Sequence, residues 1–446
     1  MIFSASETII LFLLSISIAF ECFLAIRSKS WIEIYRPTLF VAVLLVFYAL
    51  VGPLRAVLSS GEVSNFVGTS GTFYRGIEHR EFLVWGWLAA LIFYISFLSG
   101  YHLFRPSVKP RKSFNSKLSS IRKSGTILCW LGLVPYLLVY GDRVIGMLNP
   151  FSPSNFNASF FGFSGLNLGA FENYFMLAIN LLIPGVVIKF AVWLRTRAHS
   201  FSLAVWTLVA SAIYLSEAFR YRILLLLVPI LLLWLFYNKL RPKLVFLVLF
   251  MFLFIGLNGA LSITRTNSFV RGVDITALSN YSPFEVFTSS FEEAGVFLTS
   301  SAIISHTPSS IPHSYLKPFS TSLLQPIPRQ LFPNKPDGSY SSSAREVVYG
   351  TPNSYTAYLN FAEYYLAFGW LGVVAFSFIF GLICKRLWLW FLWRQFEPLP
   401  QAVYLLNASF IYVIISRGYL PQAFMLYCFT VLPSFLCYRY LLTKRF

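Results

Sequence analysis

The sequence predicts an all-α polytopic membrane protein, and two observations lead to that prediction. The chain has 446 residues, of which 57% are hydrophobic and 12% are charged, and its mean hydropathy is +0.67. Soluble domains carry roughly 25% charged residues, so this much apolar surface needs a bilayer as its solvent. The apolar residues also form long runs, and short basic segments separate most of these runs. This pattern is typical of helices that cross a membrane repeatedly.

The apolar runs predict about eleven transmembrane helices, because one crossing takes roughly 20 apolar residues. The expected spans cover residues 6–26, 37–58, 82–104, 125–145, 169–194, 200–218, 223–238, 244–263, 356–384, 402–416 and 423–441. The chain therefore divides into three parts. Eight spans occupy 1–263, a long polar interval occupies 264–355, and three spans occupy 356–446.

The distribution of positive charge predicts the orientation of these helices. Most of the 35 lysines and arginines lie in short segments that follow odd-numbered spans, for example 105–123, 239–243 and 439–445. Cytoplasmic loops carry such an excess. We therefore expect the N-terminus and the interval 264–355 outside the cytoplasm, and the C-terminus inside. The net charge of +18 follows from these loops, so it does not indicate a nucleic-acid partner.

The long interval 264–355 is expected to contain short helices and an irregular lid. Residues 282–305 carry apolar side chains at helical spacing, which predicts one or two helices lying against the bundle. The proline-rich segment 308–336 is unsuited to a long helix or a central strand. It places Arg329 and Lys335 among prolines, where they belong either to a stiffened binding loop or to an exposed surface loop.

Several basic side chains are expected at the same membrane face as this interval. They are Arg220, Arg222, Arg265, Arg329, Lys335 and Arg417. The planar guanidinium group binds two phosphate oxygens and keeps its charge, so such a group of side chains suits a diphosphate near the lipid headgroups. The alternative is that they extend to the headgroups or pair with a carboxylate such as Glu217.

Three further side chains are candidates for acid–base chemistry. Glu363 lies near the start of the ninth span and is expected to orient or deprotonate a substrate, or else to form a salt bridge with an arginine. His306 and His313 are the histidines of the long interval, and each is either a base or an exposed side chain. The sequence has no phosphate-binding glycine loop, paired carboxylates or Cys/His ligand set, so no metal and no cofactor are expected.

Several short stretches of the chain resemble the bacterial oligosaccharide repeat-unit polymerases, the Wzy-type O-antigen and enterobacterial common antigen polymerases. The matching features are Arg220 with Arg222 at a helix junction, Pro328-Arg329-Gln330-Leu331-Phe332-Pro333-Asn334-Lys335-Pro336, Asn360-Phe361-Ala362-Glu363-Tyr364 leading into Phe368-Gly369-Trp370-Leu371-Gly372, and Ser416-Arg417-Gly418 before the last span. Chain length and span count also fit this family, so the resemblance covers most of the chain.

The resemblance implies a metal-independent glycosyltransferase with a GT-C-like fold in the bacterial inner membrane, its active site facing the periplasm. The substrates it implies are undecaprenyl-diphosphate-linked oligosaccharides, and a chain-length regulator and a flippase are the implied protein partners. On this basis Arg329 and Glu363 are the expected catalytic residues. The expected substrate-binding residues are Arg220, Arg222, Arg265, Lys335 and Arg417.

Two other functions agree with many of the same features. An O-antigen ligase would use a similar donor and fold, and a histidine in the long interval would favour it. A lipid-linked oligosaccharide flippase or another transporter would show internal repeats and polar residues within many spans. The long polar interval on one side of the membrane favours an enzyme over a transporter.

Overall fold

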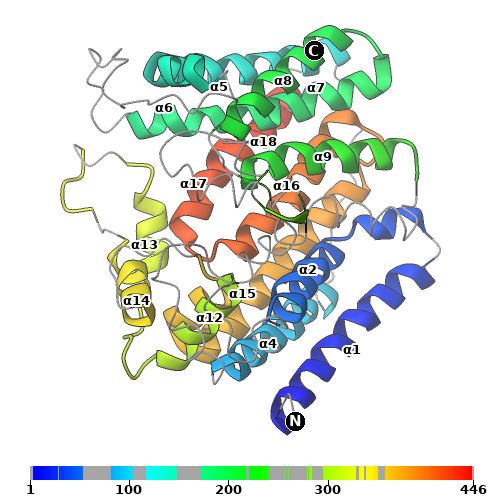
Figure 1. The fold of residues 1–446 in the computed structure, drawn as a ribbon. Helices are drawn as coiled ribbons and strands as arrows, with labels where there is room; N and C mark the ends of the chain where they lie inside the picture. Colours follow the sequence, from blue (N-terminus) through cyan, green and yellow to red (C-terminus); the bar gives the residue numbers. More distant parts are fainter. Residues whose placement is uncertain are drawn as a thin grey trace.

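The computed structural model describes residues 4–28, 30–53, 82–103, 117–147, 172–216, 220–240, 256, 260, 279, 281–283, 295–327, 331–335, 338–349 and 357–443. Within these residues the secondary structure is helical and contains no strand (Figure 1). The all-α class predicted from the sequence is therefore confirmed for the described part of the chain. The expected span 244–263 lies almost entirely outside it.

Six helical segments in the described residues are long and apolar enough to cross a membrane. They are α1 (Ala5–Arg27), α4 (Leu83–Leu103), the run of α6 (Glu172–Ala178), η7 (Ile179–Leu181) and α7 (Leu182–Thr196), α15 (Asn360–Leu392), α16 (Pro398–Ser416), and α17 (Leu420–Thr430) with α18 (Leu432–Thr443). The protein is thus a helical membrane protein by length and composition, as predicted. The count of eleven spans stays a prediction.

Other helices coincide with further expected spans or lie in the long interval. The former are α2 (Pro37–Leu45) with η2 (Val46–Val51), α5 (Leu118–Met147), α8 (Ser200–Ser216) and α9 (Arg220–Tyr237). The latter are α12 (Gly295–His306), α13 (Lys317–Leu324) and α14 (Ser339–Tyr349). Figure 1 shows α13 and α14 together on one side of the molecule.

One end of the bundle collects the helix ends that are rich in lysine and arginine, and we call it the basic end. It contains the C-terminal ends of α1, α4 and α7, the 3-10 helix η1 (Trp31–Tyr35) and the start of α16. Polar contacts join these ends: Arg36 to Glu21 (3.0 Å), His102 to Glu21 (3.0 Å), Tyr404 to the Tyr35 carbonyl (2.5 Å), and Arg195 to the Phe396 carbonyl (2.5 Å).

The opposite end of the bundle collects the other ends of the same helices. The Gly418 N–H, just after α16, donates to the Tyr358 carbonyl before α15 (2.6 Å). The Tyr174 hydroxyl on α6 donates to the Gln325 carbonyl after α13 (3.4 Å). The run α6–α7 and helix α15 therefore both point toward the basic end, and α16 points away from it. These directions agree with the expected odd-numbered and even-numbered spans.

Helices α4 and α15 pack with their backbones in contact. A Cβ atom added to Gly381 would lie 2.1 Å from the Phe97 carbonyl oxygen, and one added to Gly100 would lie 2.1 Å from that of Phe378. Small residues permit such close packing of helices in a membrane, where packing takes over much of the role of the hydrophobic effect.

We expect Gly381→Leu to destabilise the folded protein by about 3 kcal/mol or more, because the side chain must push two backbones apart. Thermal unfolding of the purified protein in detergent measures this effect. The matched control is Ile383→Leu on the same helix, where the side chain is 58% exposed. Equal melting temperatures for both variants would contradict the close packing of α4 and α15.

Helix α15 is interrupted at Phe368 and Gly369, whose backbone dihedrals are not helical. Two carbonyls at the break are satisfied from elsewhere: Leu366 accepts from the Ser314 N–H (2.8 Å) and Ala367 from the Tyr315 N–H (3.1 Å). Broken helices occur at membrane depth only where protein or water satisfies the backbone in this way. Residues 360–367 therefore form a short separate helical piece at the opposite end.

Gly369 has φ +61° and ψ −149°, a region that is open essentially to glycine alone. We expect Gly369→Ala to cost about 2 kcal/mol of stability through backbone strain. Steric crowding contributes little, because the nearest atom to the added Cβ is His313 Cε1 at 3.6 Å. The control is thermal unfolding of Leu371→Ala, which changes an 80% exposed neighbouring side chain and leaves the strained backbone position unchanged. An unchanged melting temperature for Gly369→Ala would refute the strained conformation.

Candidate functional site

The carboxylate of Glu363 lies near the start of α15 and is 2% exposed. One oxygen, Oε2, accepts from the Tyr358 hydroxyl (2.5 Å). The other, Oε1, accepts from the Tyr340 hydroxyl (2.7 Å) and from the Leu420 N–H (3.3 Å). The salt bridge with an arginine that we considered from the sequence is not found, since the ion pairs among the described residues lie around Glu21 and Glu33. Glu363 instead joins α14, α15 and α17.

The two tyrosines that contact Glu363 act as donors. Burial, followed by the charge of Glu363, raises the pKa of Tyr340 and of Tyr358 far above the ordinary value for tyrosine. Both hydroxyls therefore stay protonated at neutral pH. Ser341 Oγ lies 3.0 Å from the Tyr358 oxygen, and because Tyr358 gives its single proton to Glu363, Ser341 is the donor in that contact.

A cavity of about 180 Å³ lies between α15, α16 and α17. Glu363 is not part of its lining, but Leu420, which donates to Glu363, is. Its lining includes Arg417 and Gly418 from the turn between α16 and α17, and the aromatic rings of Phe410 and Tyr427. Two hydrogen bonds, Gly418–Tyr358 and Leu420–Glu363, hold the part of the turn that follows Arg417. We call this space the Arg417 cavity.

Asn360 lines the same cavity at the first position of α15. The residue is 2% exposed, and neither Nδ2 nor Oδ1 has a hydrogen-bond partner of ordinary geometry within the described residues. The Tyr364 hydroxyl is its nearest recorded partner, and a carboxamide can make more than one hydrogen bond, so Asn360 keeps capacity to bind a ligand in the cavity. Tyr364, one turn further along the helix, adds a hydroxyl to the same lining.

Sequence reasoning singled out Glu363 and Arg417 but missed Asn360. Its signal was available, since Asn360 lies in the stretch 360–364 near the start of the ninth expected span. With Tyr364 it forms an i, i+4 pair, which places both side chains on one helix face.

Of the two arginines at the start of α9, the structure describes the side chain of Arg222. Arg222 is 2% exposed, and its guanidinium carbon lies 5.8 Å from the centre of the Tyr221 ring. Arg220 is the first residue of α9, and its side chain lies outside the described part. Arg222 does not belong to the lining of the Arg417 cavity.

The basic residues of the long interval are only partly described. Lys335 donates from Nζ to the carbonyls of Gln325 (2.7 Å) and Ile327 (3.0 Å), so it lies against the residues that follow α13. Arg265 and Arg329 lie outside the described residues. The expected grouping of all six cations therefore stays a prediction, and among its described side chains Arg417 lines the cavity.

Each of the two histidines in the long interval has one ring nitrogen next to a backbone carbonyl. His306 Nδ1 lies 2.9 Å from the Ala302 oxygen, and His313 Nδ1 lies 3.3 Å from the Leu366 oxygen. Neither ring is part of the Arg417 cavity lining. Within the described residues no group of three or more His, Cys, Asp or Glu side chains is arranged to hold a metal ion.

In comparisons with protein-family models, curated proteins and solved structures, no significant match to this chain was found. The geometry of the Arg417 cavity and the residues around it are therefore the basis for assigning a function.

Proposed function

We propose that this protein is a metal-independent glycosyltransferase that polymerises oligosaccharide repeat units carried on undecaprenyl diphosphate. The Arg417 cavity carries the proposal, because its lining combines an arginine, a buried carboxamide next to a tyrosine hydroxyl, and aromatic rings between apolar helices. A lipid-linked glycan needs the same combination: a cation for the diphosphate, polar groups for sugar hydroxyls and apolar walls for the carrier.

In the proposed reaction the hydroxyl of an incoming repeat unit attacks the anomeric carbon of the growing glycan. A carbon–oxygen bond forms between the two glycans while the bond from the anomeric carbon to the diphosphate oxygen breaks. Undecaprenyl diphosphate leaves with the bonding electrons, and water takes the proton of the attacking hydroxyl. Arg417 stabilises the charge that builds on the leaving diphosphate.

Within this proposal Glu363 is a positioning residue. Both of its oxygens already accept hydrogen bonds, and its side chain is almost fully buried. By holding Tyr358 and the N-terminus of α17, it fixes the turn on which Arg417 stands. This assignment narrows the sequence-based proposal that Glu363 orients or deprotonates the acceptor.

We further propose that the basic end faces the cytoplasm of a bacterial cell, as the distribution of lysine and arginine suggests. A cysteine introduced at the exposed Ser343 of α14 should react with a membrane-impermeant maleimide in intact spheroplasts. A cysteine at the exposed Ala198, at the basic end, should react only after the membrane is opened. The reverse labelling pattern would invert the proposed orientation.

The function itself is tested by the surface glycan of cells that lack the gene. A polymerase deletion leaves the lipid anchor capped with a single repeat unit, and the gel shows no ladder of longer chains. Loss of every cap would instead indicate a ligase or a flippase. An unchanged ladder would exclude a part in this pathway.

A further inference from the structure

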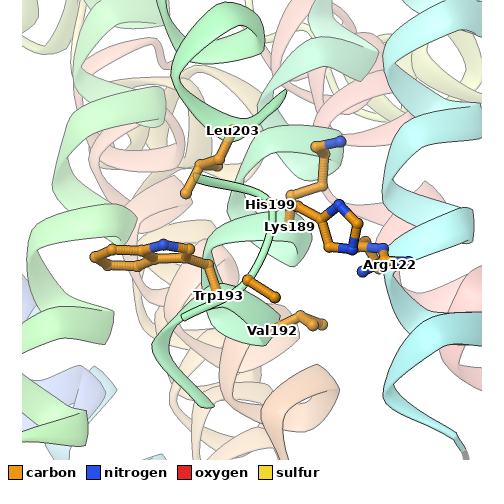
Figure 2. A pocket seen from close by; sticks show the side chains of 7 residues that line it. Arg122, Lys189, Val192, Trp193, His199 and Leu203 are labelled. Carbon is orange, nitrogen blue, oxygen red and sulfur yellow. The ribbon is translucent and has the colours of Figure 1, made fainter. Parts of the chain in front are cut away.

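A second recess lies at the basic end, between α5, α7 and the connection from α7 to α8 (Figure 2). Its inner volume is about 10 Å³, which admits roughly one water-sized group. Arg122, Lys189 and His199 contribute nitrogen-bearing side chains, which Figure 2 shows grouped on the side of α5. Trp193 and Leu203 line the other side. The recess thus has one wall with two cations, Arg122 and Lys189, which we call the cationic wall, and one apolar wall.

Lys189 is the buried member of this cationic wall, with 5% exposure. Its Nζ donates to the hydroxyls of Thr126 (3.0 Å) and Ser202 (3.0 Å), which are neutral partners. A buried ammonium group is costly unless an opposite charge lies nearby. The two hydroxyls orient the ammonium but leave its charge uncompensated.

No described carboxylate supplies that opposite charge. The ion pairs of the described residues involve Glu21 and Glu33, and none includes Arg122, Lys189 or Arg197. Arg197 and His199 both adopt left-handed backbone conformations, with φ of 53° and 62°. The Arg197 guanidinium lies 4.4 Å from the Trp193 ring centre, at the edge of the recess. The connection therefore adds positive charge to the recess at a cost in backbone strain.

The surface around the recess is apolar in the way that a lipid tail requires. Phe201 on α8 is 84% exposed, and Ile127 on α5 is 57% exposed. Trp130 of α5 contacts Trp206 of α8 edge to face, with ring centres 5.1 Å apart, so the two helices present a joined apolar wall. An anion bound at the cationic side would have its own apolar portion lying against this wall.

We propose that the recess binds the phosphate of an anionic glycerophospholipid in the leaflet at the basic end. One phosphate oxygen enters beside Lys189, and the remaining oxygens face Arg122 and His199 at the mouth. The acyl chains lie along the wall that contains Trp130 and Phe201. A zwitterionic headgroup binds poorly, because its ammonium group meets the same cations. This site is separate from the Arg417 cavity and does not depend on the proposed activity.

The test is thermal unfolding of the full-length protein in detergent micelles doped with phosphatidylglycerol, with phosphatidylcholine, or with inorganic phosphate alone. Phosphatidylglycerol should raise the melting temperature in a saturable way, and the other two additives should not. Lys189→Met and Arg122→Gln should each weaken the apparent affinity for phosphatidylglycerol by roughly tenfold or more, because each removes a charge-assisted contact. Lys123→Gln, an exposed neighbour on α5, is the matched control and should keep the wild-type affinity.

Lys189→Met is also expected to change the melting temperature in a particular direction. Without phosphatidylglycerol its melting temperature should equal or exceed that of the wild type, because an uncompensated buried charge is gone. If Lys189→Met instead lowers the melting temperature equally with both lipids, the lysine is only structural and the proposal fails. If inorganic phosphate stabilises the protein as much as phosphatidylglycerol does, the ligand is not a lipid. If Lys123→Gln loses as much affinity as Lys189→Met and Arg122→Gln, the binding is not specific to the recess. Should Lys189→Met not fold, retained affinity in Arg122→Gln would be sufficient to refute the site.

Discussion

Arg417→Ala is expected to abolish the ladder of polymerised glycan while leaving the protein in the membrane at its normal level. Arg417 lines the cavity between α15, α16 and α17, and the proposed reaction leaves negative charge on the diphosphate there. Removing one preorganised group that stabilises developing charge costs about 100-fold or more in rate. At that rate the repeat units remain single within a growth period.

The measurement is a glycan gel on deletion cells that carry each variant, with the protein quantified by immunoblot. Arg417→Lys should restore only short ladders, because lysine keeps the charge but loses the two-pronged geometry. Lys317→Gln removes an exposed charge at the start of α13 and is the control for a general effect of charge. A full-length ladder in Arg417→Ala cells would exclude the Arg417 cavity as the site of polymerisation.

Glu363→Leu is expected to destabilise the protein by about 3 kcal/mol or more. The substitution leaves the Tyr340 and Tyr358 hydroxyls and the Leu420 N–H without their acceptor, and unpaired buried groups cost roughly 1–3 kcal/mol each. Glu363→Gln should be milder, because the carboxamide keeps one acceptor oxygen. Thermal unfolding in detergent measures the melting temperature of both variants. Tyr340→Phe removes one donor, so its melting temperature should lie above those of the two Glu363 variants and below that of the wild type.

The same series separates the two roles considered for Glu363. A positioning residue loses stability and activity together, and Tyr340→Phe loses part of both. A catalytic base would lose activity in Glu363→Gln with almost no change in melting temperature, while Tyr340→Phe would stay active. The second pattern would contradict the positioning role proposed above.

The membrane spans followed well from the sequence where one helix crosses without interruption. The expected ranges 6–26 and 82–104 differ by only one residue at either end from α1 and α4. An apolar run of this length has few alternatives, because lipid cannot satisfy exposed backbone groups. Helix α16 begins at Pro398, four residues before the expected start, because proline is well accommodated in the first turn of a helix.

The breaks within spans did not follow from the sequence. The ninth expected span is interrupted at Gly369, and the eleventh is divided at Val431 between α17 and α18. A hydropathy profile detects neither break. At Gly369 the freed carbonyls accept hydrogen bonds from the N–H groups of residues 314 and 315, which lie more than fifty positions earlier in the sequence. Only the folded structure shows that residues 314 and 315 lie next to the break in α15.

The candidate site was predictable in its charged members but not in their partners. Glu363 and Arg417 were identified because charge near a membrane span is costly and therefore informative. Tyr340 and Tyr358 escaped notice, since tyrosine is common throughout this chain and aromatic residues are ordinary at membrane interfaces. Their role depends on hydrogen bonds to Glu363, which no local pattern specifies.

The central claim is that the lipid diphosphate binds at the Arg417 cavity. The most direct measurement is a cryo-electron microscopy map of the purified protein with an undecaprenyl-diphosphate-linked repeat unit. We predict density for the diphosphate in contact with the Arg417 guanidinium, with the first sugar reaching Asn360. Diphosphate density at the basic end, or a filled site in which Arg417 and Asn360 touch no part of the substrate, would contradict the account.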